Sequence, residues 1–192
     1  MKYIILFNGP PRSGKDTLAL ELQKHLPKCK IFHLAEVLKN ITHSTYGLNI
    51  PFDFFENVKD TPCFDLYNRT PRECYIQMSE HYIKPLYGNS FFIKKAVETI
   101  KSSHDDIWIV PDCGFNEEAK YLSSIDGVKC FYIILSRDGK TFDNDSREYI
   151  KLENICDRDS YINVVNTENN IEMTGLTIYN NISKWLELDK EI

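Results

Sequence analysis

The chain has 192 residues, a formal net charge of −5, and charged and hydrophobic fractions of 27% and 42%, which are ordinary for a water-soluble globular protein. The negative charge argues against a surface that grips nucleic acid over a wide area, and no apolar run approaches the ~20 residues of a membrane helix. The six cysteines form no CxxC pair, so we expect reduced thiols, no zinc site, a cytoplasmic protein and no membrane partner.

The first predicted elements are a strand, a glycine-bounded loop and a helix. The apolar run 3–7 predicts a buried strand, and the apolar residues of 18–26 share one face of a helix. Between them lies Gly9-Pro10-Pro11-Arg12-Ser13-Gly14-Lys15-Asp16-Thr17, which contains a GxxxxGK motif. A strand before this motif and a helix after it are the context in which it forms a phosphate-binding loop.

The residue types of this loop suit the phosphates of ATP. Glycines let backbone N–H groups curl around a phosphate, the helix N-terminus adds its positive dipole end, and Lys15 can reach the β and γ phosphates. We therefore expect ATP to be held by the loop residues Gly9, Pro10, Arg12, Ser13, Gly14, Lys15, Asp16 and Thr17.

Asp16 departs from the common motif, in which Ser or Thr follows the lysine and binds Mg²⁺. A carboxylate can hold the metal directly or through water, and Thr17 offers a hydroxyl one residue later. The alternative is that Asp16 forms a salt bridge with a neighbour. We favour the metal-side role.

The middle of the chain alternates between regular and irregular segments. A second strand is predicted over 30–34 and a helix over 35–46, ended by a glycine. Residues 48–69 are aromatic and irregular, and a loop of this length is usually functional or mobile. A capping box beginning at Thr70 predicts a helix to about residue 83, and a further helix follows Asn89.

The last part of the chain is predicted to hold three more strands and two helices. Continuous apolar runs at 107–110 and 130–135 predict strands that are buried on both faces, and 161–165 predicts a last strand. Helices are predicted to begin near Phe115 and to span 175–188. Strands that alternate with helices give an α/β fold, with a parallel sheet of about five strands covered on both faces.

Such a sheet binds ligands at the carboxyl ends of its strands, where the 9–15 loop, Asp112 and Arg137 all fall. Asp112 ends a buried strand, as a metal-binding acid of P-loop enzymes does, and the alternative is that it caps the next helix. Phosphoryl transfer also needs cations on the moving group, and five arginines lie in the two irregular segments. They are Arg69, Arg72, Arg137, Arg147 and Arg158, of which we single out Arg72 and Arg137 as catalytic candidates.

The assembled chain resembles the bacteriophage deoxynucleoside monophosphate kinases and related P-loop kinases. The matching stretches follow the family's order: GPPRSGKDT at 9–17, LAEVLK at 34–39, TPRE at 70–73, YGNSFF at 87–92 and VPDCGFNEEA at 110–119. The resemblance implies the three-layer nucleoside-monophosphate-kinase fold as a single domain over 1–192, with ATP and Mg²⁺ as cofactors. It also implies a host-cell cytoplasmic location if the chain is phage-encoded.

The resemblance further implies how such a domain is divided. The core would comprise 1–47 and 105–192, an acceptor-binding helical insert about 48–104, and a mobile lid about 138–160. Arg137 and Asn166 would contact ATP, and Asp16, Thr17 and Asp112 the metal. The acceptor would meet Glu36, Lys39, Arg69, Arg72, Phe92, Gly114 and Arg147.

One departure from the family concerns the acceptor. Monophosphate kinases usually carry a D-x-R-F pattern whose arginine faces the acceptor phosphate, and this chain has Gly114 at that position. The Asp-x-Gly-Phe form and the stretch 137–147 are similar to phage kinases thought to phosphorylate hydroxymethyluracil in DNA. A hydroxyl acceptor benefits from a carboxylate base, for which Asp112 and Glu36 are candidates.

Three hypotheses follow. We favour slightly an ATP-dependent kinase that phosphorylates the hydroxymethyl group of 5-hydroxymethyluracil in DNA. The first alternative is a deoxynucleoside monophosphate kinase, which the TPRE element and the small size favour. The second is a nucleotide-binding switch that binds ATP and transfers nothing.

Overall fold

The computed structural model describes residues 1–26, 28–49, 52–143, 145–155, 160–167 and 170–188. Close packing divides the chain into two units, one made of 1–33 and 97–192 and the other of 34–96. The first unit holds a sheet of five strands: β1 (Lys2–Asn8), β2 (Cys29–Ile31), β3 (Ile107–Val110), β4 (Val128–Ser136) and β5 (Tyr161–Val165). All neighbours pair in parallel, in the order β2-β3-β1-β4-β5.

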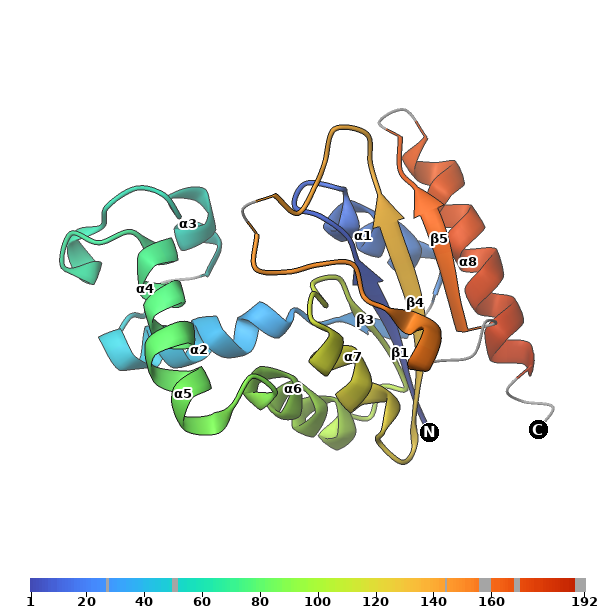
Figure 1. Ribbon diagram of the computed structural model, residues 1–192, viewed down its shortest axis with the longest axis horizontal. Coiled ribbons are helices and arrows are strands. Elements are labelled where there is room, and N and C mark those ends of the chain that lie inside the picture. The colour runs from blue at the N-terminus through green and yellow to red at the C-terminus, as the bar shows by residue number, and fades with distance from the viewer. Residues whose placement is uncertain (27, 50–51, 144, 156–159, 168–169, 189–192) are drawn as a thin grey trace. The chain divides into compact units, whose positions relative to one another are not determined.

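Two helices cover one face of this sheet. Residues alternate between the faces of a strand, and Ile5, Phe7 and Ile133 are among the strand side chains buried on the same side. They pack with apolar side chains of α1 (Lys15–His25) and α8 (Ile171–Leu188), as Figure 1 shows for the helices. This cluster is the main core of the first unit.

Helix α7 (Asn116–Ser123) covers the opposite face. Tyr132 alternates with Phe131 and Ile133 along β4, and its hydroxyl donates to the Ala119 carbonyl of α7 at 3.1 Å. The sheet therefore lies between two layers of helices. The expected α/β fold with a parallel five-stranded sheet is confirmed.

The strand order reverses its direction at β1. The chain moves from β1 to β2 and β3 on one side of the sheet, and then to β4 and β5 on the other side. Open parallel sheets bind ligands outside the carboxyl ends of their strands at such a reversal. The loops that leave β1, β3 and β4 meet at this edge.

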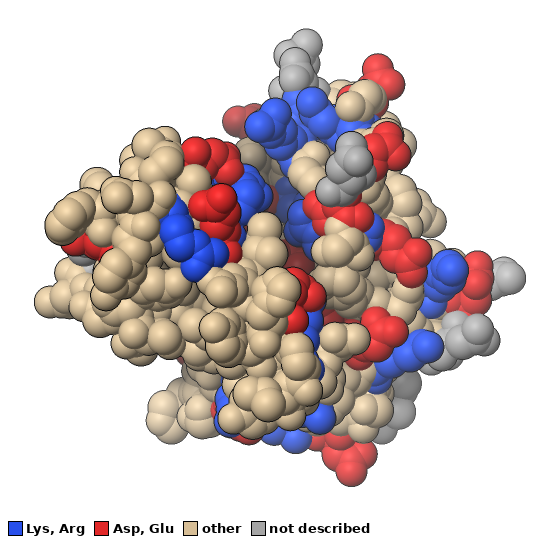
Figure 2. Space-filling view, turned by 60° about the vertical axis from the view of Figure 1, so that its left-hand side comes forward, with Lys and Arg blue, Asp and Glu red and all other residues tan. Residues whose placement is uncertain are grey.

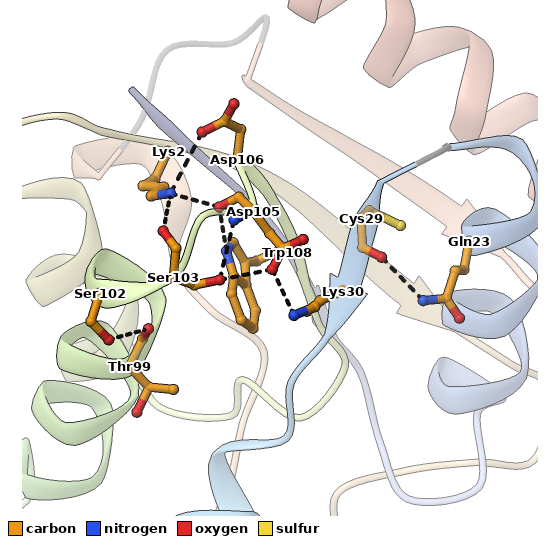
Figure 3. A network of polar contacts seen from close by, with 10 residues as sticks. All are labelled: Lys2, Gln23, Cys29, Lys30, Thr99, Ser102, Ser103, Asp105, Asp106 and Trp108. Atoms are coloured by element: carbon orange, nitrogen blue, oxygen red, sulfur yellow. Dashed lines mark hydrogen bonds and ion pairs between the residues drawn. The ribbon is translucent and has the colours of Figure 1, made fainter.

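The amino-terminal edge of the sheet is closed by a network of polar contacts (Figure 3). The ammonium of Lys2 donates to the carbonyls of Ser103 at 2.8 Å and Asp105 at 2.7 Å, and lies 3.5 Å from the carboxylate of Asp106. The Asp105 carbonyl also accepts from the Trp108 indole at 3.1 Å. The loop before β3 is thereby fastened to the start of β1.

The second unit is helical. Its elements are α2 (Leu34–Tyr46), α3 (Phe52–Asn57), a 3₁₀ turn (Phe64–Leu66), α4 (Pro71–Gln77), a π-helical stretch (Met78–Ile83), α5 (Lys84–Tyr87) and the start of α6 (Phe91–Ser102). Phe55, Leu66 and Cys74 form one apolar cluster of this unit. The helix α2, which the sequence analysis assigned to the core, packs within this unit.

Several boundaries differ from the prediction. The segment 48–69 is not wholly irregular, because α3 and the 3₁₀ turn lie inside it and Leu66 anchors it in an apolar cluster. The strand β2 ends at Ile31, and Leu34 already belongs to α2. A 3₁₀ turn (Leu152–Asn154) lies within the polar stretch 138–160.

The helix start at Thr70 is confirmed. The Thr70 hydroxyl accepts from the Glu73 N–H, and the Glu73 carboxylate accepts from the Thr70 N–H at 2.8 Å, so both halves of the capping box are present. The five cysteines within the described residues are free thiols, and Cys156 lies outside them. Among the described helices, none has the length and apolar character needed to cross a membrane.

Candidate phosphate-binding site

The loop between β1 and α1 needs glycine at both ends of its motif. A Cβ at Gly9 would lie 2.4 Å from the Leu135 carbonyl oxygen of β4, and one at Gly14 would lie 2.4 Å from the Asn166 amide nitrogen. Gly14 also has a φ of +96°, which residues other than glycine rarely adopt. Tight contact with the sheet on one side and with the loop after β5 on the other therefore sets the shape of the loop.

The turn of the loop is completed by Arg12, whose φ is +61°. The Ser13 N–H donates to the Pro10 carbonyl at 3.3 Å, and the first bond of α1 runs from the Leu18 N–H to the Gly14 carbonyl at 3.0 Å. The preceding N–H groups of a helix have no acceptor within that helix, and they are the donors that bind anions. The loop and the start of α1 thus form a backbone anion site.

Lys15 is buried at the centre of this loop. Its ammonium donates to the carbonyls of Gly9 at 2.7 Å and Pro10 at 2.8 Å. The pKa of Lys15 is lowered to about 8, chiefly by burial and also by the guanidinium of Arg147, while nearby carboxylates oppose the shift. An anion bound here would relieve both causes, because it would supply the negative charge that the buried ammonium lacks.

Asn166, in the loop after β5, is hydrogen-bonded to the backbone of the phosphate loop. Its side-chain amide donates to the Ser13 carbonyl at 2.7 Å, and its own N–H donates to the Ser136 carbonyl at 2.8 Å. Among the described residues, the Asn166 Oδ1 and the Ser13 hydroxyl are buried without a hydrogen-bond partner. The structure thus places Asn166 against the loop backbone, and its expected contact with ATP stays a prediction.

Arg137 follows β4 and reaches the same loop. Its guanidinium donates to the Arg12 carbonyl at 3.4 Å. This contact brings a cation to the phosphate loop, and the expected contact of Arg137 with ATP stays a prediction. Its catalytic role remains untested.

The candidate metal ligands fit a magnesium ion that is bound mainly through phosphates. Asp16 and Thr17 are exposed at the start of α1, and Asp112 lies close enough to Lys15 to raise the pKa of that ammonium. Carboxylates and a hydroxyl are the hard oxygen donors that Mg²⁺ prefers, and one or two of them suffice when phosphates complete the shell. Asp16 also lies 3.6 Å from the His33 imidazole, so the alternative of an ion pair has a partner.

The loop after β3 is organised by Glu118, which the sequence analysis did not consider. The Glu118 carboxylate accepts from the N–H groups of Gly114 at 3.0 Å and Phe115 at 3.1 Å. Burial raises the pKa of Glu118 to about 7, and the charge of Asp112 adds to the shift. The cap position of α7 is occupied by Phe115, so the alternative that Asp112 caps this helix is wrong.

Arg147 lies directly against Gly114. A Cβ at residue 114 would lie 2.3 Å from Cδ and 2.6 Å from Cγ of Arg147. The guanidinium is held by Asp145, whose carboxylate accepts from Nε at 2.8 Å and from Nη2 at 2.6 Å. Both partners respond to this pairing, which lowers the pKa of Asp145 and raises that of Arg147.

Two asparagines fasten the segment that carries Arg147. The Asn8 amide, at the end of β1, donates to the carbonyls of Cys113 and Glu148, each at 3.1 Å, and its oxygen accepts from the Ile150 N–H at 3.1 Å. Asn116 accepts from the Lys151 N–H at 2.9 Å. These bonds join residues 148–151 to the end of β1 and to the start of α7.

The expected lid is therefore only partly described. Residues 145–152 carry the bonds to Asn8 and Asn116 and the buried side chains of Ile150 and Leu152. Arg158, one of the five arginines, lies outside the described residues. The movement of a lid stays a prediction.

The remaining acceptor candidates belong to the helical unit. Arg72 pairs with Asp60 at 2.5 Å, and Arg69 donates to Gln77. Phe92 is buried against Met78 and Ile83, which accounts for it as a core residue. Glu36 and Lys39 are half-buried on α2. The roles of these residues in substrate binding stay predictions.

No protein-family model matches this chain, and no curated protein sequence matches it. Solved structures with overall similarity include the tunicamycin resistance protein of Deinococcus radiodurans, with a TM-score of 0.48, 13% identity and coverage of 95% of this chain and 96% of that one. A gluconokinase from Sinorhizobium meliloti 1021 has a TM-score of 0.47 and 11% identity, with coverage of 98% of this chain and 97% of that one. The dephospho-CoA kinase from Campylobacter jejuni has a TM-score of 0.47 and 13% identity, with coverage of 96% of this chain and 98% of that one. Because these similarities are low, the functional argument rests on the site itself.

Proposed function

We propose that this protein is an ATP-dependent phosphotransferase. The observation that carries the proposal is the buried ammonium of Lys15, which is held inside a glycine-shaped loop at the carboxyl edge of a parallel sheet. A cation in that position is unfavourable unless an anion joins it, and the helix N-terminus beside it is built to bind phosphate. The donor would bind with its β and γ phosphates against this loop.

The neighbouring residues supply what phosphoryl transfer requires. The reaction moves the terminal phosphoryl group of ATP to an acceptor oxygen and leaves ADP, and its catalysis is mostly positioning and charge neutralisation. Lys15, Arg137 and Arg147 supply positive charge around the phosphate loop, and Asp112 would hold Mg²⁺ or accept a proton from a hydroxyl acceptor. Bound Mg²⁺ would neutralise phosphate charge.

For the acceptor, the sequence favours the hydroxymethyl group of 5-hydroxymethyluracil in DNA because Gly114 replaces an arginine and because of the similarity of the stretch 137–147. The position of Arg147 weakens that argument, since its side chain lies on Gly114 and returns a guanidinium to this edge of the sheet. On the molecular face in Figure 2, Lys and Arg are also interspersed with Asp and Glu, and a broad part of that face carries none of these four residue types. DNA phosphates favour clustered Lys and Arg.

The geometry therefore favours a free deoxynucleoside monophosphate as acceptor, with hydroxymethyluracil in DNA as the second candidate. A phosphate-bearing acceptor needs cations near the transferred group and no general base. A hydroxyl acceptor in DNA would instead depend on Asp112 or Glu36 as a base. The hypothesis of a nucleotide-binding switch without transfer predicts ATP binding that no acceptor changes.

The test is transfer from γ-labelled ATP with Mg²⁺ to each acceptor in parallel. Label on a free monophosphate supports the nucleotide kinase, and label only in duplex DNA that contains hydroxymethyluracil supports the DNA-base kinase. ATP binding without label on either acceptor would refute both in favour of the switch. Asp112→Asn sharpens the result, because its loss of rate should be far larger for a hydroxyl acceptor than for a phosphate.

A further inference from the structure

Arg147 lies where the loops after β1, β3 and β4 meet. Three independent features converge on its side chain: the bare backbone of Gly114 under its aliphatic part, the carboxylate of Asp145 on its guanidinium, and the nearby ammonium of Lys15. Each feature concerns a different part of the chain. Together they describe a built position for a cation.

The first feature is steric. The aliphatic part of Arg147 occupies the space that any side chain at residue 114 would need, since a Cβ there would lie 2.3 Å from its Cδ. Gly114 does not have the positive φ that by itself would require glycine, so the arginine is the reason that residue 114 must lack a side chain. Gly114 and Arg147 are thus one structural unit.

The second feature is the holding partner. Asp145 accepts from Nε and Nη2 of Arg147 and also from its backbone N–H at 3.0 Å. Bidentate contact of this kind fixes the plane of a guanidinium. Within the described part of the chain, no residue accepts from Nη1 of Arg147, which leaves donors for an external acceptor.

The third feature is charge. Arg147 lies close enough to Lys15 to lower the pKa of that ammonium, although both side chains are largely removed from water. Two such cations repel each other. Around Lys15, the charges of Asp16, Asp112 and Asp145 offset the downward shift of its pKa only partly. Around Arg147, the bond to Asp145 and the charges of Asp112 and Glu118 outweigh burial and keep its pKa raised. The Lys15 ammonium has a third N–H beyond the two bonds to its own loop. This arrangement favours an anion that both cations contact.

We infer that Arg147 and Lys15 form a two-cation site for a phosphoryl group, with Gly114 providing the space for the arginine and Asp145 orienting it. The inference rests on the proposed function for the identity of the anion as a phosphoryl group of a nucleotide. Two sources share this chemistry, the terminal phosphate of ATP and the phosphate of a monophosphate acceptor. Arg147 is a phosphate-contacting residue in both cases, and Asp145 is a positioning residue.

The first experiment compares binding in the full chain, without turnover. Calorimetry would measure ADP, the non-hydrolysable analogue β,γ-methylene ATP, and each deoxynucleoside monophosphate, for the wild type and for Arg147→Ala. If the anion is the terminal phosphate of ATP, the variant loses at least tenfold in affinity for the analogue and little for ADP. If it is the acceptor phosphate, the same loss is seen only for a monophosphate.

Arg147→Lys keeps the positive charge and loses the bidentate contact, so it should recover part of the lost affinity, which a purely structural role would not predict. Lys184→Ala removes an exposed lysine of α8 and should change none of the affinities. Thermal unfolding of each variant checks that the fold remains. Unchanged affinity of Arg147→Ala for ADP, for the ATP analogue and for every deoxynucleoside monophosphate would overturn the inference.

A double-mutant cycle tests the steric link. Gly114→Ala should displace Arg147 and lower the same affinity by a similar factor, and the double variant Gly114→Ala/Arg147→Ala should be no weaker than Arg147→Ala alone. Losses that multiply in the double variant would contradict the link. These are binding measurements, so they are independent of transfer. If the variants show the expected losses and the wild type transfers no phosphate, the proposed function is refuted and the two-cation site stands.

Discussion

The two edges of the sheet use lysine in opposite ways. At the amino-terminal edge, the three N–H groups of Lys2 have Ser103, Asp105 and Asp106 as partners, and the network is complete within the chain (Figure 3). At the carboxyl-terminal edge, the partners of Lys15 among the described residues are two carbonyls of its own loop, and a second cation lies near it. The first arrangement is complete without a ligand, and the second leaves a buried ammonium whose pKa is lowered to about 8.

This difference separates stability from function within one sheet. Contacts at the amino-terminal edge join the loop before β3 to β1, so their loss should weaken the fold and leave the site intact. Contacts at the carboxyl-terminal edge hold a tight loop and cations in place, and burying the Lys15 ammonium there is unfavourable. Their loss should weaken ligand binding more than stability.

The largest effect is expected for Lys15→Met. Removal of the buried ammonium should lower phosphate transfer by at least ~10²–10³-fold, since a charged donor to the transferred group is lost. Stability should not fall, because burial disfavours the charge, as the pKa of about 8 shows. Initial rates and thermal unfolding measure the two quantities. Lys184→Met is the matched control, and a Lys15 variant that keeps more than a tenth of the rate would contradict the assignment.

Gly9→Ala should damage both the loop and the fold. The new Cβ would lie 2.4 Å from the Leu135 carbonyl, a backbone atom that cannot move aside, so we expect a loss of about 1–3 kcal/mol in stability. ADP affinity should fall at least tenfold, because the loop shifts. Gly127→Ala is the control: it meets open space at a φ of +76° and should cost about 1 kcal/mol without affecting ADP. Equal ADP affinity in both variants would argue against the cradle.

Glu118→Gln tests the pH dependence of the site loop. The folded pKa of about 7 exceeds the usual 4.5, so the folded state binds more protons than the unfolded state between these values. Stability should therefore fall as pH rises from about 4.5 to 7, by about 2–3 kcal/mol for a shift of this size, and then level off. Glutamine keeps the acceptor oxygen and should remove this slope. Denaturation between pH 5 and 8 measures it, with exposed Glu117→Gln as control, and an unchanged slope would exclude Glu118 as its source.

The smallest effect is expected for Lys2→Met at the opposite edge. Loss of the charged donor to two carbonyls should lower stability by about 1–3 kcal/mol. ADP affinity should stay within twofold of the wild type. Urea denaturation and calorimetry give the two values. A large loss of ADP affinity would show that the two edges are not separate in function.

Much of the fold could be predicted because its signals are local. The strands at 107–110 and 161–165 were predicted with the bounds that the structure shows, since short apolar runs between turns indicate buried strands. The capping box at Thr70 depends on residues three apart. The prediction failed in part at 48–69, because α3 and the 3₁₀ turn are short and Leu66 is buried by distant residues.

The candidate site was predictable where its residues are neighbours in the chain or directly follow a predicted strand, as Asp112 and Arg137 do. Asn8 and Glu118 had no recognisable signal, because an asparagine after a strand and a glutamate in a helix are common on surfaces. Their importance comes from burial and from the backbone groups that they bond. For Asn166, the expected contact with ATP stays a prediction, and its bond to the Ser13 carbonyl depends on the position of β5 beside β4.

The sequence by itself determined the phosphate loop, since a strand, two glycines, a lysine and a helix within 25 residues prescribe a local backbone shape. It also determined the parallel sheet, because alternating apolar strands and helices have few ways to bury their faces. Only the tertiary structure decided that Arg147 lies on Gly114 and near Lys15. These three residues belong to different loops, and the strand order β2-β3-β1-β4-β5 brings them to one edge, where the space left by a missing side chain admits the arginine.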